Sequence, residues 1–222
     1  MEPNPEAIRS ITHDMRNLLT AIRGHAELAL RGISPEDPAR EDVAHCVVVA
    51  AALFDLIDQL DGADESDSLI AVNLDSSVGS MRRLLDALLP DTLELIVATD
   101  AAGAYVGIPK LRIERIVLNL ALNARDAMDG GGTLTIRTDR PADDLARIIV
   151  SDTGEGFSDE ALEHLFEAGF TTKADRGGSG HGLSALAPFV DRIGGSIEVD
   201  SVSGEGATIT VSLPTADPLH IG

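Results

Sequence analysis

Three groups of residues in the second half of the chain are of types that bind phosphate and a hard cation. Asn119 and Asn123 are four residues apart in a run of helical periodicity, so their side-chain oxygens share a face and could help to bind Mg²⁺. Asp152 directly follows a strand-like run and begins the pattern Asp-x-Gly-x-Gly. The glycine-rich residues 177–182 open a helix, where backbone N–H groups can approach a phosphate. Each feature alone is weak evidence, but their order in one segment indicates a phosphate-binding site.

A histidine near the N-terminus offers a different chemistry, that of a nucleophilic nitrogen. Ile8 and Ile11 occupy positions a and d of a heptad, which places His13 at f, the outermost position of its helix. A histidine at this position is solvated and reachable. A carboxylate that holds one imidazole N–H makes the other nitrogen a better nucleophile. His25 falls at a core d position, which predicts a buried structural residue.

Two antiparallel helices are needed to carry this histidine. Gly32 ends the first helix, and Ser34 caps the second with Pro35 in its first turn, so only a short loop joins them. Both helices carry heptad stripes, formed by Ile8, Ile11, Met15, Leu18, Ile22, His25 and Ala29 and by Val43, Cys46, Ala50, Leu53, Ile57 and Leu60. A single hairpin leaves much of both stripes in water. We therefore predict that two copies pair into a four-helix bundle, which makes the protein a homodimer.

Strands and helices alternate after residues 63–68, a stretch that contains no large apolar residue. We expect strands at 69–74, 93–99, near 105, 133–138, 147–151, 196–200 and 207–213, and helices at 77–89, 109–128 and 184–193. This order predicts an α/β sandwich of one sheet and one helical layer. The fold class is thus α+β: a helical hairpin at 1–62, a linker at 63–68, an α/β domain at 69–216 and a tail at 217–222.

The composition excludes several classes of function. Seventeen Lys and Arg against 37 Asp and Glu give a net charge of −20, which argues against duplex nucleic-acid binding. The longest apolar run, 46–54, is too short to span a membrane, and no secretory signal is present. A single cysteine, Cys46, excludes an internal disulfide and fits a reducing compartment, so we expect a cytoplasmic protein.

The motifs, taken together, resemble the catalytic core of sensor histidine kinases of two-component systems. Residues 114–127 resemble the N box, 152–156 the G1 box, 165–173 the F box and 178–184 the G2 box. The first helix adds His13-Asp-Met-Arg-Asn17, which resembles the H box of the dimerisation and phosphotransfer hairpin. The resemblance covers about residues 6–214. It implies the ATP-binding fold shared with gyrase, Hsp90 and MutL.

The resemblance also implies roles for individual residues. In the hairpin, His13 would accept the phosphoryl group, Asp14 would hold its ring, and Asn17 would orient water for dephosphorylation of the partner. Glu114 would act as general base or position the reacting histidine. Asn123 would bind Mg²⁺, and ATP would contact Asn119, Asp152, Gly154, Gly156, Lys173, Gly180 and Gly182. Residues 168–180 would form a short lid. His181 departs from the family pattern, where leucine is usual; we expect a tolerated, partly exposed substitution, with a phosphate contact as the alternative.

The implied activity is ATP-dependent autophosphorylation of His13, followed by transfer to an aspartate of a separate response regulator, with phosphatase activity in addition. A histidine phosphotransferase with a non-catalytic ATP-like domain is the alternative, although such proteins usually lack intact nucleotide motifs. An anti-sigma-type serine kinase is a third reading, which the hairpin with His13 counts against. The two expected domains account for the whole length, which leaves the signal to an upstream sensor protein or to a longer parent chain.

Overall fold

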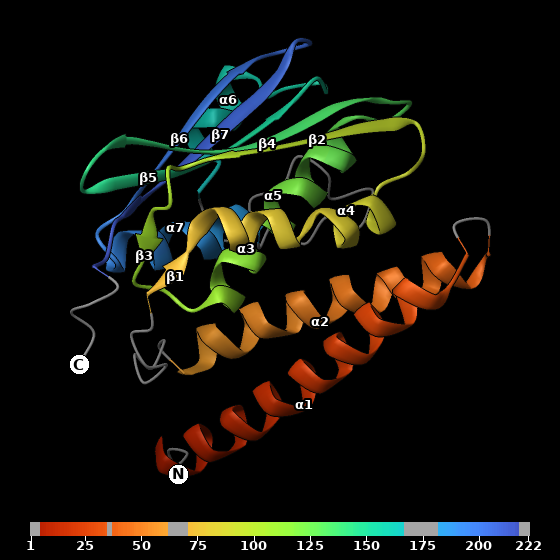
Figure 1. Ribbon diagram of the computed structural model, residues 1–222, viewed down its shortest axis with the longest axis vertical. Coiled ribbons are helices and arrows are strands. Elements are labelled where there is room, and N and C mark those ends of the chain that lie inside the picture. Colours follow the sequence, from red (N-terminus) through yellow and green to blue (C-terminus); the bar gives the residue numbers. More distant parts are fainter. Residues whose placement is uncertain (1–4, 35–36, 62–70, 167–181, 218–222) are drawn as a thin grey trace. The chain divides into compact units, whose positions relative to one another are not determined.

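The computed structural model describes residues 5–34, 37–61, 71–166 and 182–217. The chain divides into two compact units, Met1–Asp67 and Ser68–Gly222 (Figure 1). The first unit is helical and the second combines helices with a sheet. None of the helices within the described ranges is long and apolar enough to cross a membrane.

The first unit is an antiparallel hairpin of α1 (Pro5–Gly32) and α2 (Ala39–Asp61), as predicted. The predicted cap at Ser34 is wrong, because α2 begins at Ala39 and Asp37 Oδ1 accepts a hydrogen bond from the Ala39 N–H at 2.9 Å. At the same end of the hairpin, the Arg40 guanidinium donates to the carbonyls of Leu30 and Ile33, at 3.2 and 3.1 Å. These bonds fix the level at which the two helices lie beside each other.

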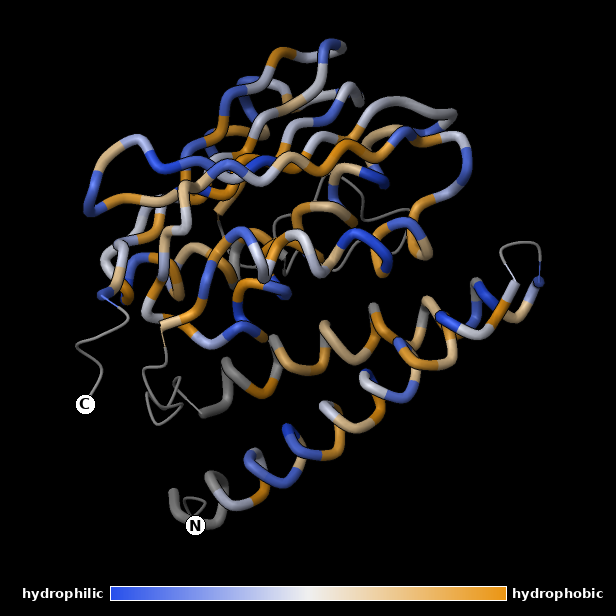
Figure 2. The backbone as a smooth tube through the Cα atoms, in the orientation of Figure 1, coloured by the Kyte–Doolittle hydropathy of each residue, from blue (hydrophilic) through white to orange (hydrophobic). Residues whose placement is uncertain are grey.

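The predicted stripe of α1 does not pack against α2. Ile11, Met15, Leu18 and Ile22 keep between 40% and 65% of their surface exposed in the single chain. The buried residues of α1 lie on a neighbouring stripe that begins one position later along the chain, namely Thr12, Leu19, Ala26 and Leu30. His25 is also exposed, so its predicted burial is wrong for a single chain, because it shares the exposed stripe. Figure 2 shows hydrophobic and hydrophilic residues recurring along both helices.

The second unit contains a five-stranded sheet in the order β2-β4-β5-β7-β6. Its strands are β2 (Leu93–Asp100), β4 (Gly132–Ala142), β5 (Leu145–Asp152), β7 (Gly206–Pro214) and β6 (Ser196–Val202). β2 pairs with β4 in parallel, and the other neighbours are antiparallel. A separate two-stranded pairing joins β1 (Val72–Asn73) to β3 (Tyr105–Val106). The predicted mixed α/β sandwich is therefore confirmed.

Helices α3 (Leu74–Ser80), α5 (Lys110–Ala127) and α7 (Gly182–Arg192) pack on one face of the sheet (Figure 1). Alternate residues of the central strands form the core beneath them, among them Leu134, Ile136, Ala146, Ile148, Val150, Ile209 and Val211. This alternation is the pattern of a sheet with one buried face and one solvated face. α5 lies over β5 and contacts β4 and β7, so it is held at the centre of the layer.

Three elements differ from the sequence prediction. The expected strand at 69–74 contains only the two residues of β1 within the described range, because the Asn73 side chain caps α3 by accepting from the Ser76 N–H at 2.8 Å. The expected helix at 77–89 is two helices, α3 and α4 (Arg82–Leu88), separated at Met81. A short helix, α6 (Asp159–His164), was not predicted, although Ser158 before it is a good cap and accepts from Ala161 N.

The solvated face of the sheet carries an ion pair between neighbouring strands. Asp139 of β4 and Arg147 of β5 are in register, and their two hydrogen bonds measure 2.7 and 2.6 Å. The hydrogen bond from Arg147 is the main cause that lowers the pKa of Asp139 below its usual value. Since the folded pKa is lowered, this carboxylate stabilises the fold above its unfolded pKa of about 4 and loses this effect as pH falls through the folded pKa.

We expect Asp139→Asn to lower the free energy of unfolding by about 1 kcal/mol at neutral pH, the usual size for a half-exposed pair. The difference between wild type and variant should be constant above about pH 4 and shrink as the pH falls further. Chemical denaturation over a series of pH values measures it. Asp143→Asn is the matched control, since Asp143 is fully exposed and lies 3.8 Å from Arg140. An equal loss in both variants would contradict the prediction.

Candidate functional site

Helix α5 carries the two asparagines of the predicted nucleotide site. It begins after Pro109, and its buried side faces the sheet with Ile113, Ile116, Val117, Leu120, Ala121 and Ala124. Asn119 and Asn123 are both half-buried. At about 100° per residue they lie only about 40° apart around the helix, so their side chains emerge from the same face. The structure thus brings the two asparagines together as the sequence predicted.

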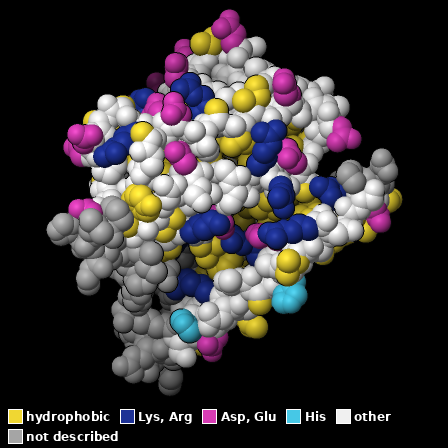
Figure 3. All heavy atoms as spheres, in the orientation of Figure 1, with side chains coloured by type: hydrophobic (Ala, Val, Ile, Leu, Met, Phe, Trp, Pro, Cys, Tyr) yellow, Lys and Arg dark blue, Asp and Glu magenta, His cyan; other side chains and the backbone are white. Residues whose placement is uncertain are grey.

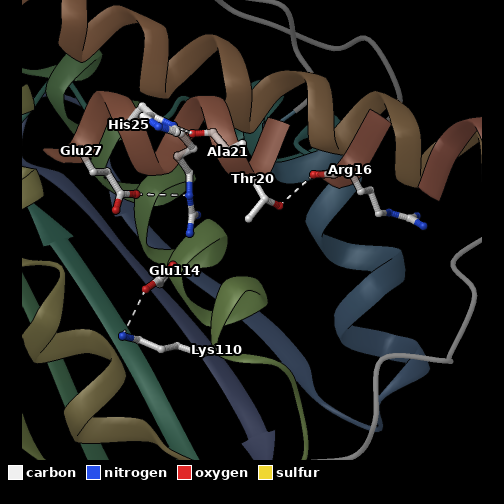
Figure 4. A network of polar contacts seen from close by, with 8 residues as sticks. Arg16, Thr20, Ala21, His25, Glu27, Lys110 and Glu114 are labelled. Carbon is white, nitrogen blue, oxygen red and sulfur yellow. Dashed lines mark hydrogen bonds and ion pairs between the residues drawn. The ribbon is translucent and has the colours of Figure 1, made fainter. Parts of the chain in front are cut away.

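Glu114 lies on a different face of α5. Five residues separate it from Asn119, which is about 140° of rotation at 100° per residue. Its carboxylate is half-buried, and Lys110 Nζ lies 3.5 Å from Glu114 Oε1 one turn earlier in the helix (Figure 4). The helix therefore separates Glu114 from the asparagine pair, and its role as general base or positioning residue stays a prediction.

The loop after β5 begins at Asp152 and is held against the end of α5. Asp152 Oδ1 accepts a hydrogen bond from the Gly154 N–H at 2.9 Å, and the Glu155 N–H donates to the Ala127 carbonyl at 3.0 Å. Ala127 follows Asn123 by one helical turn. The Asp152 loop and the asparagine face therefore meet at the same end of α5.

Two glycines allow this loop to approach its neighbours. A Cβ on Gly154 would lie 2.6 Å from the Ala127 carbonyl oxygen. Gly156 has a φ of +62°, and a Cβ there would collide with the Val202 carbonyl oxygen. Gly204 lies in the turn that joins β6 to β7, and its N–H donates to the Glu155 carbonyl at 2.7 Å. The loop is therefore held between α5 and this turn.

We expect Gly154→Ala to weaken nucleotide binding at least about tenfold and to lower the melting temperature, because the added methyl group forces the loop away from Ala127. Calorimetric titration with ATP and thermal unfolding measure the two effects. Gly24→Ala in α1 is the matched control, because no atom beyond its chain neighbours and the local helix backbone lies within 4 Å of the added Cβ, and alanine favours the helix. Unchanged affinity in Gly154→Ala would contradict the role of this loop.

Sequence reasoning missed one residue of this loop environment. Gly206, at the start of β7, has a φ of +105°, and a Cβ there would collide with the Asp152 carbonyl oxygen. Only glycine lets β7 begin this close to Asp152. The pattern Gly204-Glu-Gly206 between two strand-like runs was the signal that could have identified it.

Part of the predicted site falls outside the described residues. Lys173, Gly180, His181 and the lid at 168–180 belong to this part of the chain. Gly182 is the first residue of α7, so the predicted order of glycine-rich segment and helix holds at its described end. α7 packs against α5 and β6, which joins it to the same helical layer as the asparagine pair.

His13 lies on the solvent-exposed surface of α1, with 73% of its side chain exposed. Asn17 Nδ2 lies 3.3 Å and Asp14 Oδ1 3.6 Å from the Nδ1 atom of its ring. Both neighbours therefore face the same ring nitrogen, Nδ1. The structure brings together the three residues that the sequence singled out in this helix.

The asparagine face of α5 and the Asp152 loop fit a magnesium–nucleotide complex in their chemistry. Asn119 and Asn123 supply neutral oxygen ligands on one half-buried face, and Mg²⁺ in such sites takes few protein ligands beside phosphate and water oxygens. Asp152 is half-buried at a strand end, where a carboxylate can accept from the amino group of a base. Gly154 and Gly156 have no side chains, so at these two positions the loop presents only its backbone.

The architecture is an α/β sandwich that carries a strand-end aspartate and an asparagine pair on its central helix. Residues 109–217 match the family described as histidine kinase-, DNA gyrase B- and HSP90-like ATPase. The sensor kinase CckA of Brucella abortus is 33% identical in an alignment 220 positions long, which covers 92% of this chain and 23% of that protein. The chain belongs to the histidine kinase family and corresponds to its catalytic core.

Solved structures share the fold. Full-length ShkA in complex with AMPPNP matches with a TM-score of 0.62 at 23% identity, covering 98% of this chain and 48% of ShkA. Histidine kinase ThkA in complex with the response regulator protein TrrA matches with a TM-score of 0.58 at 19% identity, covering 95% of this chain and 61% of ThkA. The chain spans less than half the length of the first curated relatives it matches.

Proposed function

We propose that this protein is an ATP-dependent protein-histidine kinase that phosphorylates His13 and then passes the phosphoryl group to an aspartate of a separate response regulator. The observation that carries the proposal is the combination in one chain of an exposed, flanked histidine and an ATP-binding domain. In this proposal, residues 1–62 accept the phosphoryl group and pass it on, and residues 69–216 bind ATP. Residues 63–68 are proposed as the linker between the two parts and residues 217–222 as a tail.

The reaction requires His13 Nε2 to attack the terminal phosphorus of ATP in line with the leaving oxygen. Asp14 faces Nδ1 and, by accepting its N–H, leaves the lone pair on Nε2, while Asn17 lies beside the same ring nitrogen. Asn123 would hold Mg²⁺, which would supply positive charge at the phosphates. Asn119 contacts the phosphate side, Asp152 accepts from the adenine amino group, and Glu114 acts as general base or positions the reacting histidine. Lys173, Gly180 and Gly182 are proposed to contact the phosphates.

Asn17 supports a second activity at the same histidine. Its amide is beside His13 on the exposed surface of α1, where it can orient a water molecule toward an aspartyl phosphate on a docked partner. We therefore include phosphatase activity toward the response regulator in the proposal. A matched structure contains a histidine kinase with its response regulator, which supports a partner of this kind.

The proposed assembly is a homodimer formed by the hairpin. The exposed apolar side chains of α1, together with Val49 and Leu53 of α2 at 46% and 38% exposure, form a surface that a second hairpin would bury. Contact between two such surfaces completes a four-helix bundle. A reducing, cytoplasmic location and a signal received from an upstream sensor, in the same or another chain, complete the proposal.

Incubation of the purified chain with ATP labelled on its terminal phosphate tests the function. We expect label that is lost in acid and stable in base, as a phosphorylated histidine requires, and transfer of this label to a receiver domain. Absence of label on the chain with ATP, together with acceptance of label from a phosphorylated regulator, would replace the kinase by a histidine phosphotransferase.

A further inference from the structure

His25 and Cys46 lie at the same level of the helical hairpin. His25 is seven residues before Gly32, the last residue of α1, and Cys46 is seven residues after Ala39, the first residue of α2. The bonds from Arg40 to the carbonyls at the end of α1 fix the two antiparallel helices in this alignment. At 1.5 Å per residue, both side chains are about 10 Å from the loop end of the hairpin.

Both residues belong to the exposed stripes of the hairpin. Leu18 and Leu53 are each fourteen residues from the loop end of their helix, and Ile22 and Val49 are each ten, so the stripes match level by level. All four are exposed, as are His25 and Cys46. Figure 3 shows histidine and apolar side chains together on the surface of the hairpin.

The two stripes also face the same side. In α1 the residues after Leu18 and His25 are buried, and in α2 the residues after Cys46, Val49 and Leu53 are buried. In each helix the exposed stripe lies one residue before the buried stripe. It is therefore rotated from the buried stripe by about 100° around the helix axis, in the same sense when each helix is viewed from its own N-terminus. In antiparallel helices this places both exposed stripes on one side of the hairpin.

The ring of His25 is already oriented as in many metal ligands. Its Nδ1 lies 2.7 Å from the Ala21 carbonyl oxygen one turn earlier, so Nδ1–H donates to this carbonyl (Figure 4). Metal-binding histidines usually donate their second ring N–H to such an acceptor, which fixes the tautomer with an unprotonated Nε2. Nε2 of His25 is therefore the ring atom that can bind a cation.

We propose that two copies of the chain bind one Zn²⁺ ion between them, through Nε2 of His25 and the thiolate of Cys46 from each copy. The inference depends on the homodimer proposed above. Within the described residues of one chain, no three His, Cys, Asp or Glu side chains are placed to hold a metal, so a second copy must complete the set. Two imidazoles and two thiolates are a tetrahedral zinc set, and helical bundles build such sites from facing helices.

The proposed ion would also provide partners for polar groups that formation of the bundle buries. Pairing of the exposed stripes removes from water a layer of two imidazoles and two thiols between layers of Leu, Ile and Val. Polar groups buried in this way need partners. Zn²⁺ supplies a partner to all four at once, and each thiol releases its proton to water as it binds. The ion would then strengthen the dimer at the loop end of the bundle.

Cobalt titration of the full chain tests the site, with the reduced protein first freed of metal. We expect the visible bands of tetrahedral Co²⁺ and the near-ultraviolet band of a Co²⁺–thiolate bond, saturating at one ion per two chains. Zn²⁺ should displace the cobalt and lower the dissociation constant of the dimer at least about tenfold. His25→Gln and Cys46→Ser should lose the bands, whereas His45→Gln and His13→Gln should keep them.

Light scattering on the metal-free protein separates this inference from the proposed function. A dimer without metal that gives no cobalt bands overturns the zinc site and leaves the dimeric kinase standing. A monomer both with and without metal overturns the homodimer and the zinc site together. Bands that persist in His25→Gln, or saturation at one ion per chain, overturn the ligand set. Unchanged thermal unfolding of the metal-free His25→Gln and Cys46→Ser variants excludes misfolding as the cause of lost bands.

Discussion

Replacing His13 by glutamine is expected to reduce phosphoryl incorporation from ATP by at least about 1,000-fold, because it removes the nucleophile. Glutamine keeps a polar side chain of similar reach on the exposed surface of α1, so the helix should be undisturbed. Incorporation of the labelled terminal phosphate into the purified chain measures the effect. ATP binding should be unchanged, since the nucleotide residues lie in the other unit.

The matched control is His45→Gln, which makes the same substitution in α2 and should retain autophosphorylation. Mixing His13→Gln chains with chains that carry Asn123→Ala adds a further test of the homodimer. Labelling of the mixture, when neither variant labels alone, shows that one chain phosphorylates its partner. Label at wild-type level in His13→Gln would show that another residue accepts the phosphoryl group, and the proposed role of the hairpin would fail.

The helices of the hairpin were predictable because their heptad stripes are long and regular. What the sequence did not show is which neighbour each stripe contacts. The stripe with Leu18 is exposed in the single chain, while the neighbouring stripe with Leu19 is buried. A heptad repeat shows that a stripe is apolar but does not identify the surface that the stripe packs against. The prediction therefore placed His25 in a core that a single chain does not form.

The candidate site was predictable where its chemistry depends on local spacing. Asn119 and Asn123 share a face because helical geometry dictates it, and Asp152 ends its strand as the pattern indicated. The closeness of the Asp152 loop to Ala127 depends instead on packing between α5 and the sheet, which no local pattern encodes. Gly206 was missed for the same reason, since its close neighbour, Asp152, is 54 positions earlier in the sequence.

Replacing Asn123 by alanine is expected to weaken magnesium-dependent ATP binding by at least about 100-fold. Asn123 is the side chain proposed to bind the ion that joins the phosphates to the protein. The need for this ion is larger here than in a neutral domain. The unit 68–222 contains 12 Lys and Arg against 23 Asp and Glu, a net charge of −11, so its overall field repels a nucleotide.

Titration of ATP at several Mg²⁺ concentrations distinguishes this role from a structural one. Wild-type affinity should rise steeply with Mg²⁺, and that of Asn123→Ala should depend on it only weakly, while the thermal unfolding of both remains alike. Asn17→Ala makes the same substitution in the hairpin and should keep the wild-type dependence on Mg²⁺. If Asn123→Ala retains the magnesium dependence of the wild type, the asparagine face of α5 does not hold the ion. An acidic domain would then have to bind its anionic ligand by backbone amides and Lys173 alone.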